Sequence, residues 1–341
     1  MECNDKNNLE CNDKINLEFT TTMTLPLEII DSLQFYIGEN ENLLKVFPEV
    51  TKYIHEYINY DSFKGDPQMV LNLGISKSIV LEPFKNLQVL HCGINQLQEL
   101  PKLPSSLQEL YCGYNKLREL PELPDSLREL YCHNNRLQKL PELPDSIQKF
   151  NCSRNQLQEL PELSNSFQFL ICSYNRLQEL PELPDSLQKF NCSHNQLREL
   201  PKLPNSLQIL YSSHNQLQKL PELPMDLELL YCYCNQLQKV QKLPDSLRLL
   251  DCNTNQLQEL PDLPSSLEIL YCYDNLLREI PELPSGFRKL YCSNNRLQKL
   301  PELPSSSFKF LSCYNNDQIQ NRKEIENYCK KNGIIFENNF F

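Results

Sequence analysis

Hydrophobic and polar positions repeat along most of this chain in a unit of 20 residues, of which LQELYCGYNKLRELPELP (residues 107–124) is one copy. The unit runs from about Phe84 to about Asn316, and one extra residue, Ser307, shifts the frame of the last copy. Its asparagine returns in twelve copies, at Asn95, Asn115, Asn135, Asn155, Asn175, Asn195, Asn215, Asn235, Asn255, Asn275, Asn295 and Asn316. A fixed period of this length predicts a solenoid, in which each unit contacts only its neighbours.

Each unit is expected to contain one short strand and one extended arm. Around Leu110, side chains alternate in the period of a strand, which turns Leu110 and Cys112 inward and Glu109 and Tyr111 outward. The two prolines that follow lack an N–H group and fix φ, so they favour an extended or polyproline arm over a helix. The predicted fold is an α/β solenoid with a parallel sheet on one face, extended arms on the other and helical caps at both ends.

Two motifs of the unit resemble those of a known family. The pattern L-x-x-L-x-C-x-x-N-x-L at residues 107–117 resembles the leucine-rich repeat, with Cys in place of one Leu. The tail L-P-x-L-P-x-S-L resembles the short repeats of bacterial effector proteins and of large DNA viruses. The resemblance covers more than two thirds of the chain. It implies a leucine-rich repeat array that recognises another protein, of viral or effector type.

The repeated asparagine and cysteine are both interpreted as structural. A buried amide can bond the backbone of its own and neighbouring turns. Eleven cysteines share one inward column, in which their thiols should be unreactive: Cys92, Cys112, Cys132, Cys152, Cys172, Cys192, Cys232, Cys252, Cys272, Cys292 and Cys313. The N-terminus MECNDK has no apolar core of a secretory leader. We therefore expect a reduced core in a cytoplasmic protein, in the host cytoplasm if it is viral or an effector.

One column places His194, His214 and Cys234 on three successive turns. Such ligands suit zinc, but the strand spacing separates the outer two by roughly 10 Å. That separation is too wide for two direct bonds of about 2 Å to one ion. We interpret them as unrelated rim residues, and we expect no metal and no cofactor.

The outward columns carry the candidate binding residues. Tyrosine supplies large amphipathic contact area at low entropic cost, although it also simply suits an exposed strand. We favour a recognition surface, because aromatic area on a solenoid face is usually functional. The predicted partner-binding residues are Tyr111, Tyr131, Tyr211, Tyr231, Tyr233, Tyr271, Tyr273 and Tyr291.

Charge and composition narrow the class of partner. The net charge is −11, from 33 basic and 44 acidic residues, with no basic stripe, so nucleic acid and anionic membranes are poor partners. No apolar run approaches the roughly eighteen residues of a membrane helix. Seven glycines leave little material for a phosphate-binding loop. We therefore expect a non-enzymatic protein that binds another protein.

The repeats divide the chain into five segments. Residues 1–24 are polar and predicted to be disordered. Residues 25–64 are predicted to be helical, residues 65–83 to form a degenerate first turn or connector, and residues 84–316 to hold the repeats. Residues 317–341 form the predicted C-terminal cap, with a helix from Asp317 to Asn332, a stop at Gly333 and a tail, Ile334–Phe341, packed on it.

Residues 25–64 show apolar residues at the spacing of three short helices, the third from Pro48 through Ile58. This order resembles the F-box, which docks a substrate receptor onto the Skp1 subunit of a cullin-type ubiquitin ligase. The resemblance implies Skp1 docking through Leu25, Pro26, Glu28, Ile29, Ile30 and Leu33. The alternative is a helical cap on the first repeat, in which case the solenoid is an effector or decoy scaffold that binds a host protein.

Overall fold

The computed structural model describes residues 58–59, 72–75, 80–304, 307–316 and 318–337. The chain divides into two compact units, Met1–Glu56 and Tyr57–Phe341, and every described residue belongs to the second. The polar N-terminus, the first two expected helices and all six expected Skp1-docking residues lie outside the described residues.

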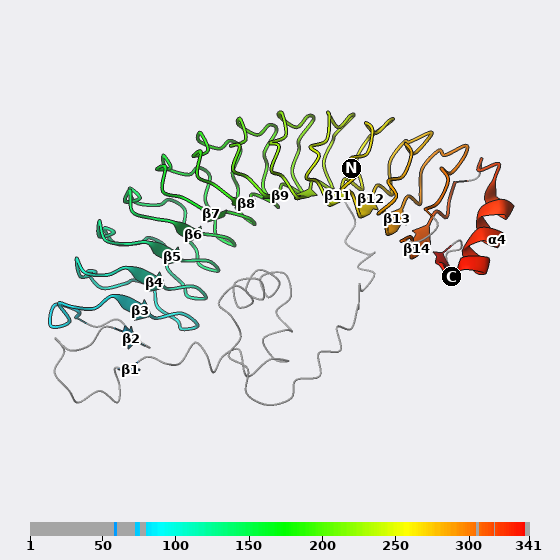
Figure 1. The fold of residues 1–341 in the computed structure, drawn as a ribbon. Coiled ribbons are helices and arrows are strands. Elements are labelled where there is room, and N and C mark those ends of the chain that lie inside the picture. Colours follow the sequence, from blue (N-terminus) through cyan, green and yellow to red (C-terminus); the bar gives the residue numbers. More distant parts are fainter. Residues whose placement is uncertain (1–57, 60–71, 76–79, 305–306, 317, 338–341) are drawn as a thin grey trace, which may run out of the picture. The chain divides into compact units, whose positions relative to one another are not determined.

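One parallel sheet of 15 strands, in chain order, runs through the described part of the second unit (Figure 1). Each repeat strand pairs in register with residues twenty positions further on, except at the last step, where Leu290 lies opposite Leu311. The elements are β1 (Ile58–Asn59), β2 (Asn72–Gly74), β3 (Val89–His91), β4 (Glu109–Tyr111), β5 (Glu129–Tyr131), β6 (Lys149–Asn151), β7 (Phe169–Ile171), β8 (Lys189–Asn191), β9 (Ile209–Tyr211), β10 (Leu229–Tyr231), β11 (Leu249–Asp251), β12 (Ile269–Tyr271), β13 (Lys289–Tyr291), β14 (Phe310–Ser312), α4 (Arg322–Asn332) and β15 (Ile335–Glu337).

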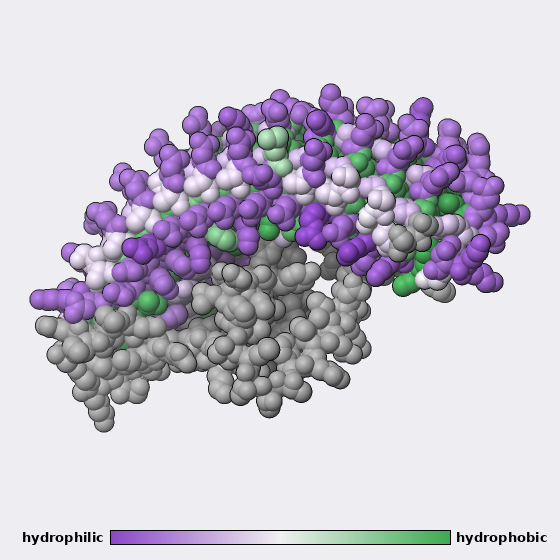
Figure 2. Space-filling model, viewed as in Figure 1, coloured by the Kyte–Doolittle hydropathy of each residue, from purple (hydrophilic) through white to green (hydrophobic). Residues whose placement is uncertain are grey.

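The core lies between the strands and the arms. Leu110 and Cys112 are 0% exposed, as the alternating pattern predicts, and Leu120 from the arm closes the core opposite them. Each arm turns back through a hydrogen bond such as that from Leu107 N to the carbonyl of Pro104, at 3.1 Å. Hydrophilic side chains project along the edge of the turns opposite the strands (Figure 2). The solenoid with extended arms is therefore confirmed.

The asparagine column is a ladder of hydrogen bonds through the core. Asn195 Nδ2 donates to the carbonyls of Cys192 (3.0 Å) and Ser193 (3.3 Å) in its own turn. It also donates to Cys172 O of the previous turn (3.1 Å), while its Oδ1 accepts from Leu177 N (3.0 Å). Apart from the first copy, every asparagine of the column makes the same four bonds. The structural interpretation of this residue is confirmed.

The residue before each asparagine adopts a left-handed conformation, with φ between 50° and 57°. Non-glycine side chains rarely adopt it, and the cost is about 1–3 kcal/mol where the side chain is unsuited. This conformation lets the local N–H group, such as that of Tyr114, donate to the next turn, here to His133 O at 2.9 Å. The column consists of Ile94, Tyr114, Asn134, Arg154, Tyr174, His194, His214, Cys234, Thr254, Asp274, Asn294 and Asn315.

A second ladder of side chains links the arms. Ser106 Oγ donates to the carbonyl of Leu87 in the previous turn at 2.7 Å, which satisfies a carbonyl that the strand ladder does not reach. Asp226 and Gly286 interrupt this ladder. The serines that continue it are Ser126, Ser146, Ser166, Ser186, Ser206, Ser246, Ser266 and Ser307.

The prediction of a third N-terminal helix is wrong at the last residue of that helix, Ile58. Ile58 and Asn59 form strand β1, which pairs in parallel with β2 and extends the sheet beyond the repeats. The apolar residues there have helical spacing, but the open edge of the sheet offers unpaired backbone groups. Pairing with that edge favours a strand over a helix.

The C-terminal end differs from expectation in two ways. Helix α4 begins at Arg322 rather than near residue 317, because the Asn321 amide bonds both backbone groups of Leu300 and fixes the preceding segment on the last turn. It ends at Gly333, as predicted, with a φ of 67°. The tail does not simply pack on this helix: β15 adds a parallel strand to β14, with Phe336 opposite Leu311. Within the described residues, a helix caps only this end.

The asparagine ladder should be more important for stability than any exposed polar residue. Asn195→Ala should lower the free energy of unfolding by about 3 kcal/mol, since it leaves buried backbone groups without partners. Asn205→Ala, at an exposed arm position, should change it by less than about 0.5 kcal/mol. Urea denaturation followed by circular dichroism checks both, and equal midpoints for the two variants would contradict the structural role.

Candidate functional site

The outward surface of the sheet is the main candidate site, and we call it the strand face. It consists of the first and third residue of each repeat strand, together with the second residue after each strand. The predicted tyrosines all lie on it: six end the strands β4, β5, β9, β10, β12 and β13, while Tyr233 and Tyr273 follow β10 and β12. Most are half-buried, and Tyr131 is 9% exposed.

The tyrosines at the strand ends form stacked rows, because strand spacing suits offset stacking of aromatic rings. Tyr111 and Tyr131 stack with centroids 4.9 Å apart, and Tyr211 and Tyr231 stack at 4.5 Å. Two residues that the sequence analysis did not include lengthen the rows. His91 stacks on Tyr111 at 4.6 Å, and Phe310 stacks on Tyr291, which itself stacks on Tyr271.

Asp251 interrupts the tyrosine row of the C-terminal half. It lies between Tyr231 on one neighbouring strand and Tyr271 on the other. Its Oδ1 accepts hydrogen bonds from both the backbone and the side-chain amide of Asn253. Burial raises the pKa of this carboxyl from its ordinary value of 3.8 to about 7, although the two Asn253 bonds oppose the shift. A carboxylate is thus held among aromatic rings.

The same interruption occurs in the next column. Asn253 is 3% exposed and lies between Tyr233 and Tyr273, whose turns are joined to its own through Cys234 N and Thr254 N. Burial is the main reason that the pKa of Tyr273 is raised, and the charges of Asp251 and Asp274 add to it. Four tyrosines on the two neighbouring turns therefore flank one carboxyl group and its amide partner.

The first position of each strand divides the strand face into two halves. In the N-terminal half this position is charged on β4, β5, β6 and β8, as in the ion pair of Lys149 with Glu129 (3.1 Å). Lys189 there lies over the ring of Phe169, 4.9 Å from its centroid. In the C-terminal half the position is apolar over four successive strands, at Ile209, Leu229, Leu249 and Ile269. This apolar row runs beside the tyrosine row.

A further aromatic row includes two of the residues considered for zinc. The rings of His194 and His214 stack face to face at 4.0 Å, and Tyr174 stacks on His194 at 3.9 Å. Arg154 covers Tyr174 from the other side, 4.2 Å from its centroid. Burial, helped by the nearby His214 and Arg154, lowers the pKa of His194 to about 3. His194 is therefore uncharged at neutral pH within this stack.

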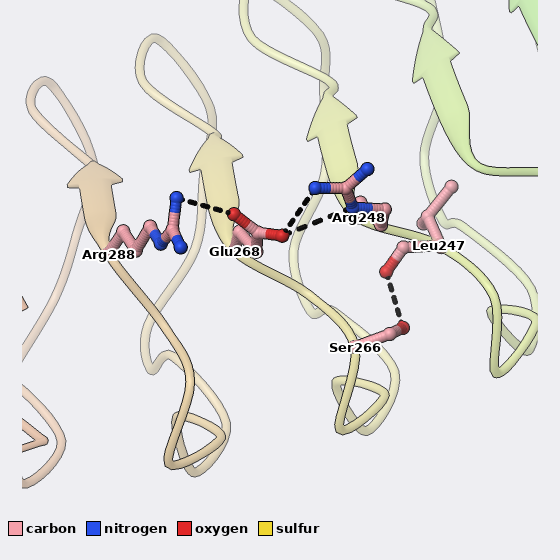
Figure 3. Close-up of polar contacts among 5 residues, drawn as sticks. All are labelled: Leu247, Arg248, Ser266, Glu268 and Arg288. Atoms are coloured by element: carbon pink, nitrogen blue, oxygen red, sulfur yellow. Dashed lines mark hydrogen bonds and ion pairs between the residues drawn. The ribbon is translucent and has the colours of Figure 1, made fainter. Parts of the chain in front are cut away.

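Charged side chains cross from turn to turn at the edge of the C-terminal half. Glu268 Oε1 accepts from Arg248, with an N–O distance of 2.8 Å, and Oε2 lies 3.0 Å from Arg288 Nη1 (Figure 3). Both arginines are more than half exposed, so the pairs contribute little to stability. The carboxylate that pairs with both arginines is thus Glu268.

The cysteine column is buried and contains free thiols. Burial raises the pKa of each of these thiols, to about 12 for Cys92, which keeps them protonated and unreactive. Cys329, on the buried side of α4, is also a buried free thiol, and only Cys234 among the described cysteines is partly exposed. No group of three potential metal ligands occurs among the described residues, and none of their helices is long and apolar enough to cross a membrane.

Sequence reasoning placed the tyrosines on the strand face but did not single out the other residues of this candidate site. It overlooked the apolar row and the role of Asp251, although aligning the first and third strand positions of the repeats would have revealed both. It also overlooked the pairing of Asp251 with Asn253, which depends on two columns being read together.

Comparisons with known proteins identify the repeat. The family model for leucine-rich repeats (2 copies) matches residues 105–145. The solved structure of YopM from Yersinia enterocolitica WA-314 is 36% identical, with a TM-score of 0.60, over 70% of this chain and 62% of that chain. The chain thus matches less than two thirds of that YopM chain.

Two further structures are similar. YopM from Yersinia pestis, described as a leucine-rich effector protein, is 31% identical over 69% of this chain and 85% of that chain, with a TM-score of 0.46. The functional domain of InlJ from Listeria monocytogenes, described as including a cysteine ladder, is 22% identical over 69% of this chain and 64% of that chain, with a TM-score of 0.50. The InlJ match supports the fold alone. A comparison with curated protein sequences gave no match.

The raised pKa of Asp251 should make stability depend on pH in a way that Asp251→Asn removes. The folded chain binds more protons than the unfolded chain between about pH 4 and pH 7. The stability contributed by the protonated carboxyl is therefore lost as pH rises through about 7. Between pH 5 and pH 8 the wild-type chain should lose about 2 kcal/mol more than the variant. Urea denaturation at both pH values measures the difference, and parallel profiles would refute it.

Proposed function

The chain is a leucine-rich repeat protein, and we propose that it is a non-enzymatic receptor that binds another protein through the C-terminal half of the strand face. The observation that carries the proposal is the apolar row, Ile209 to Ile269, lying beside the stacked tyrosines. Aromatic residues with apolar neighbours are enriched at the centres of protein interfaces.

The rest of the molecule supports this assignment. The turns hold the face in one shape, so binding would order few side chains, and the stacked rings are already fixed. The described thiols of the cysteine column are free and buried, which agrees with a cytoplasmic location. A net charge of −11 favours a protein partner over nucleic acid.

Two substitutions on the strand face test the receptor function. Tyr231→Ala combined with Tyr271→Ala should weaken partner binding by more than about tenfold, because aromatic anchors usually contribute over 1 kcal/mol each. The matched control combines Gln238→Ala with Gln258→Ala on the exposed arms. Proteins cross-linked from eukaryotic lysate should be retained by the wild-type chain and the control and lost from the tyrosine variant. Loss from both variants, or from neither, would count against the strand face, provided that the three melting temperatures agree.

The N-terminal segment suggests a finer function. We propose that Leu25, Pro26, Glu28, Ile29, Ile30 and Leu33 dock the chain onto Skp1, so that it delivers the bound protein to a cullin-type ubiquitin ligase. The F-box-like helix pattern of residues 25–64 supports this role, although Ile58 belongs to a strand. The alternative is an effector or decoy scaffold for a host protein, with this segment serving only as a cap.

Purified Skp1 distinguishes the two. In the receptor function, the wild-type chain should bind Skp1 at micromolar concentration, and Leu25→Ala with Pro26→Ala should abolish the complex through lost apolar contacts. The tyrosine variant of the strand face should still bind Skp1. Isothermal titration calorimetry measures all three, and an absence of wild-type binding would leave the scaffold function.

A further inference from the structure

The break in the tyrosine row has the chemistry of a site for a cation. We propose that Asp251, Asn253 and the four tyrosines Tyr231, Tyr233, Tyr271 and Tyr273 bind a lysine or arginine side chain of the protein partner. This inference rests on the proposed receptor function and identifies the partner's contacting group. We call these six residues the Asp251 site.

The spacing of the strands leaves room for such a side chain. Tyr231 and Tyr271 lie one strand on either side of Asp251, so their backbones are about 9.6 Å apart. An alkyl stem in contact with two rings needs about 7–8 Å between them. Each ring is stacked on a tyrosine of the next strand outward, with centroids 4.5 Å apart. The shorter Asp251 side chain occupies the strand position between them.

The charges around the break favour a cation. Both hydrogen bonds from Asn253 reach Oδ1 of Asp251, and no ion pair to Asp251 occurs within the described residues. Arg248, on the same turn, and Arg288, two turns further on, both pair with Glu268. Asp251 therefore has no cationic partner in the part of the chain that the structure describes, and Asp274 adds a second negative charge at Tyr273.

Aromatic faces and the carboxylate act together on such a ligand. Tyrosine faces attract ammonium and guanidinium groups, and more strongly where water is excluded. The raised pKa of Asp251 is a sign that its charge is poorly solvated. A bound cation would stabilise that charge, and hence binding and ionisation of Asp251 favour each other. The neighbouring Leu249 would contact the apolar residues that flank the cation in the partner.

A matched substitution separates charge from shape. Asp251→Asn keeps the size of the side chain and removes its charge. The fold accepts asparagine in this column, since Asn151 and Asn191 occupy it on β6 and β8. Asn151 Oδ1 accepts from Ser153 N at 3.0 Å, as Asp251 Oδ1 accepts from Asn253 N. The control is Asp262→Asn, which removes an exposed carboxylate from an arm.

The test titrates short peptides into the full chain labelled with ¹³C-tyrosine and follows the aromatic resonances by NMR. The probe is acetylated, amidated leucyl-lysyl-leucine, with norleucine in place of lysine as the neutral control and arginine in place of lysine as the second cation. Single Tyr→Phe variants at the four tyrosines assign the signals. At least one cationic peptide should bind about tenfold or more tightly than the norleucine peptide, with saturable shifts at these four tyrosines.

Asp251→Asn should abolish this preference for charge, whereas Asp262→Asn should leave it unchanged. Equal affinities for charged and neutral peptides, or an unchanged preference in Asp251→Asn, would overturn the proposal. Failure of the receptor function has a different signature. If the receptor function is wrong, the Tyr231→Ala and Tyr271→Ala variant retains the cross-linked proteins. If only the cation site is wrong, that variant loses them, whereas Asp251→Asn binds the partner as well as the wild-type chain does.

Discussion

The asparagine ladder is the interaction on which the rest of the structure depends. Each amide bonds three carbonyls and one N–H group, from two successive turns, where the backbone turns away from the strand into the core. Without these bonds several backbone groups per turn would be buried and unpaired. The ladder therefore allows a sharp turn directly after each strand. Because every turn is then built alike, equivalent side chains on the strand face are spaced regularly from one turn to the next.

That regular spacing determines the chemistry of the face. Strand spacing places equivalent side chains close enough for rings to stack, so a run of tyrosines becomes a rigid row. It also places any exception between two rings: Asp251 lies in register between Tyr231 and Tyr271, and burial raises the pKa of its carboxyl. The core is uniform along the array, whereas the face differs from turn to turn, and this separation of stability from specificity suits a protein that recognises another.

Most of the fold could be predicted from the sequence because every copy of the repeat has the same pattern of inward and outward residues. The inward leucines, the cysteine column and the structural asparagine all follow from alternation and burial. Single-copy features were harder to predict. The tail containing Phe336 is too short to distinguish a strand from a packed segment, and Ile58 fits both a helix stripe and a strand edge. The tyrosines were evident as a type of residue, but Asp251 gains its meaning only from neighbours twenty residues away on either side.

The left-handed column has a consequence for how such a surface diversifies. That backbone conformation usually demands glycine or asparagine, yet here isoleucine, tyrosine, arginine, histidine, cysteine and threonine all adopt it. The hydrogen bonds of the adjoining asparagine and of the next turn impose it, whatever the side chain. A gene that grows by copying this unit can therefore vary that residue freely in each new copy. Each duplication adds a turn with the same backbone and one variable position, so new binding specificities can arise without a change in the backbone.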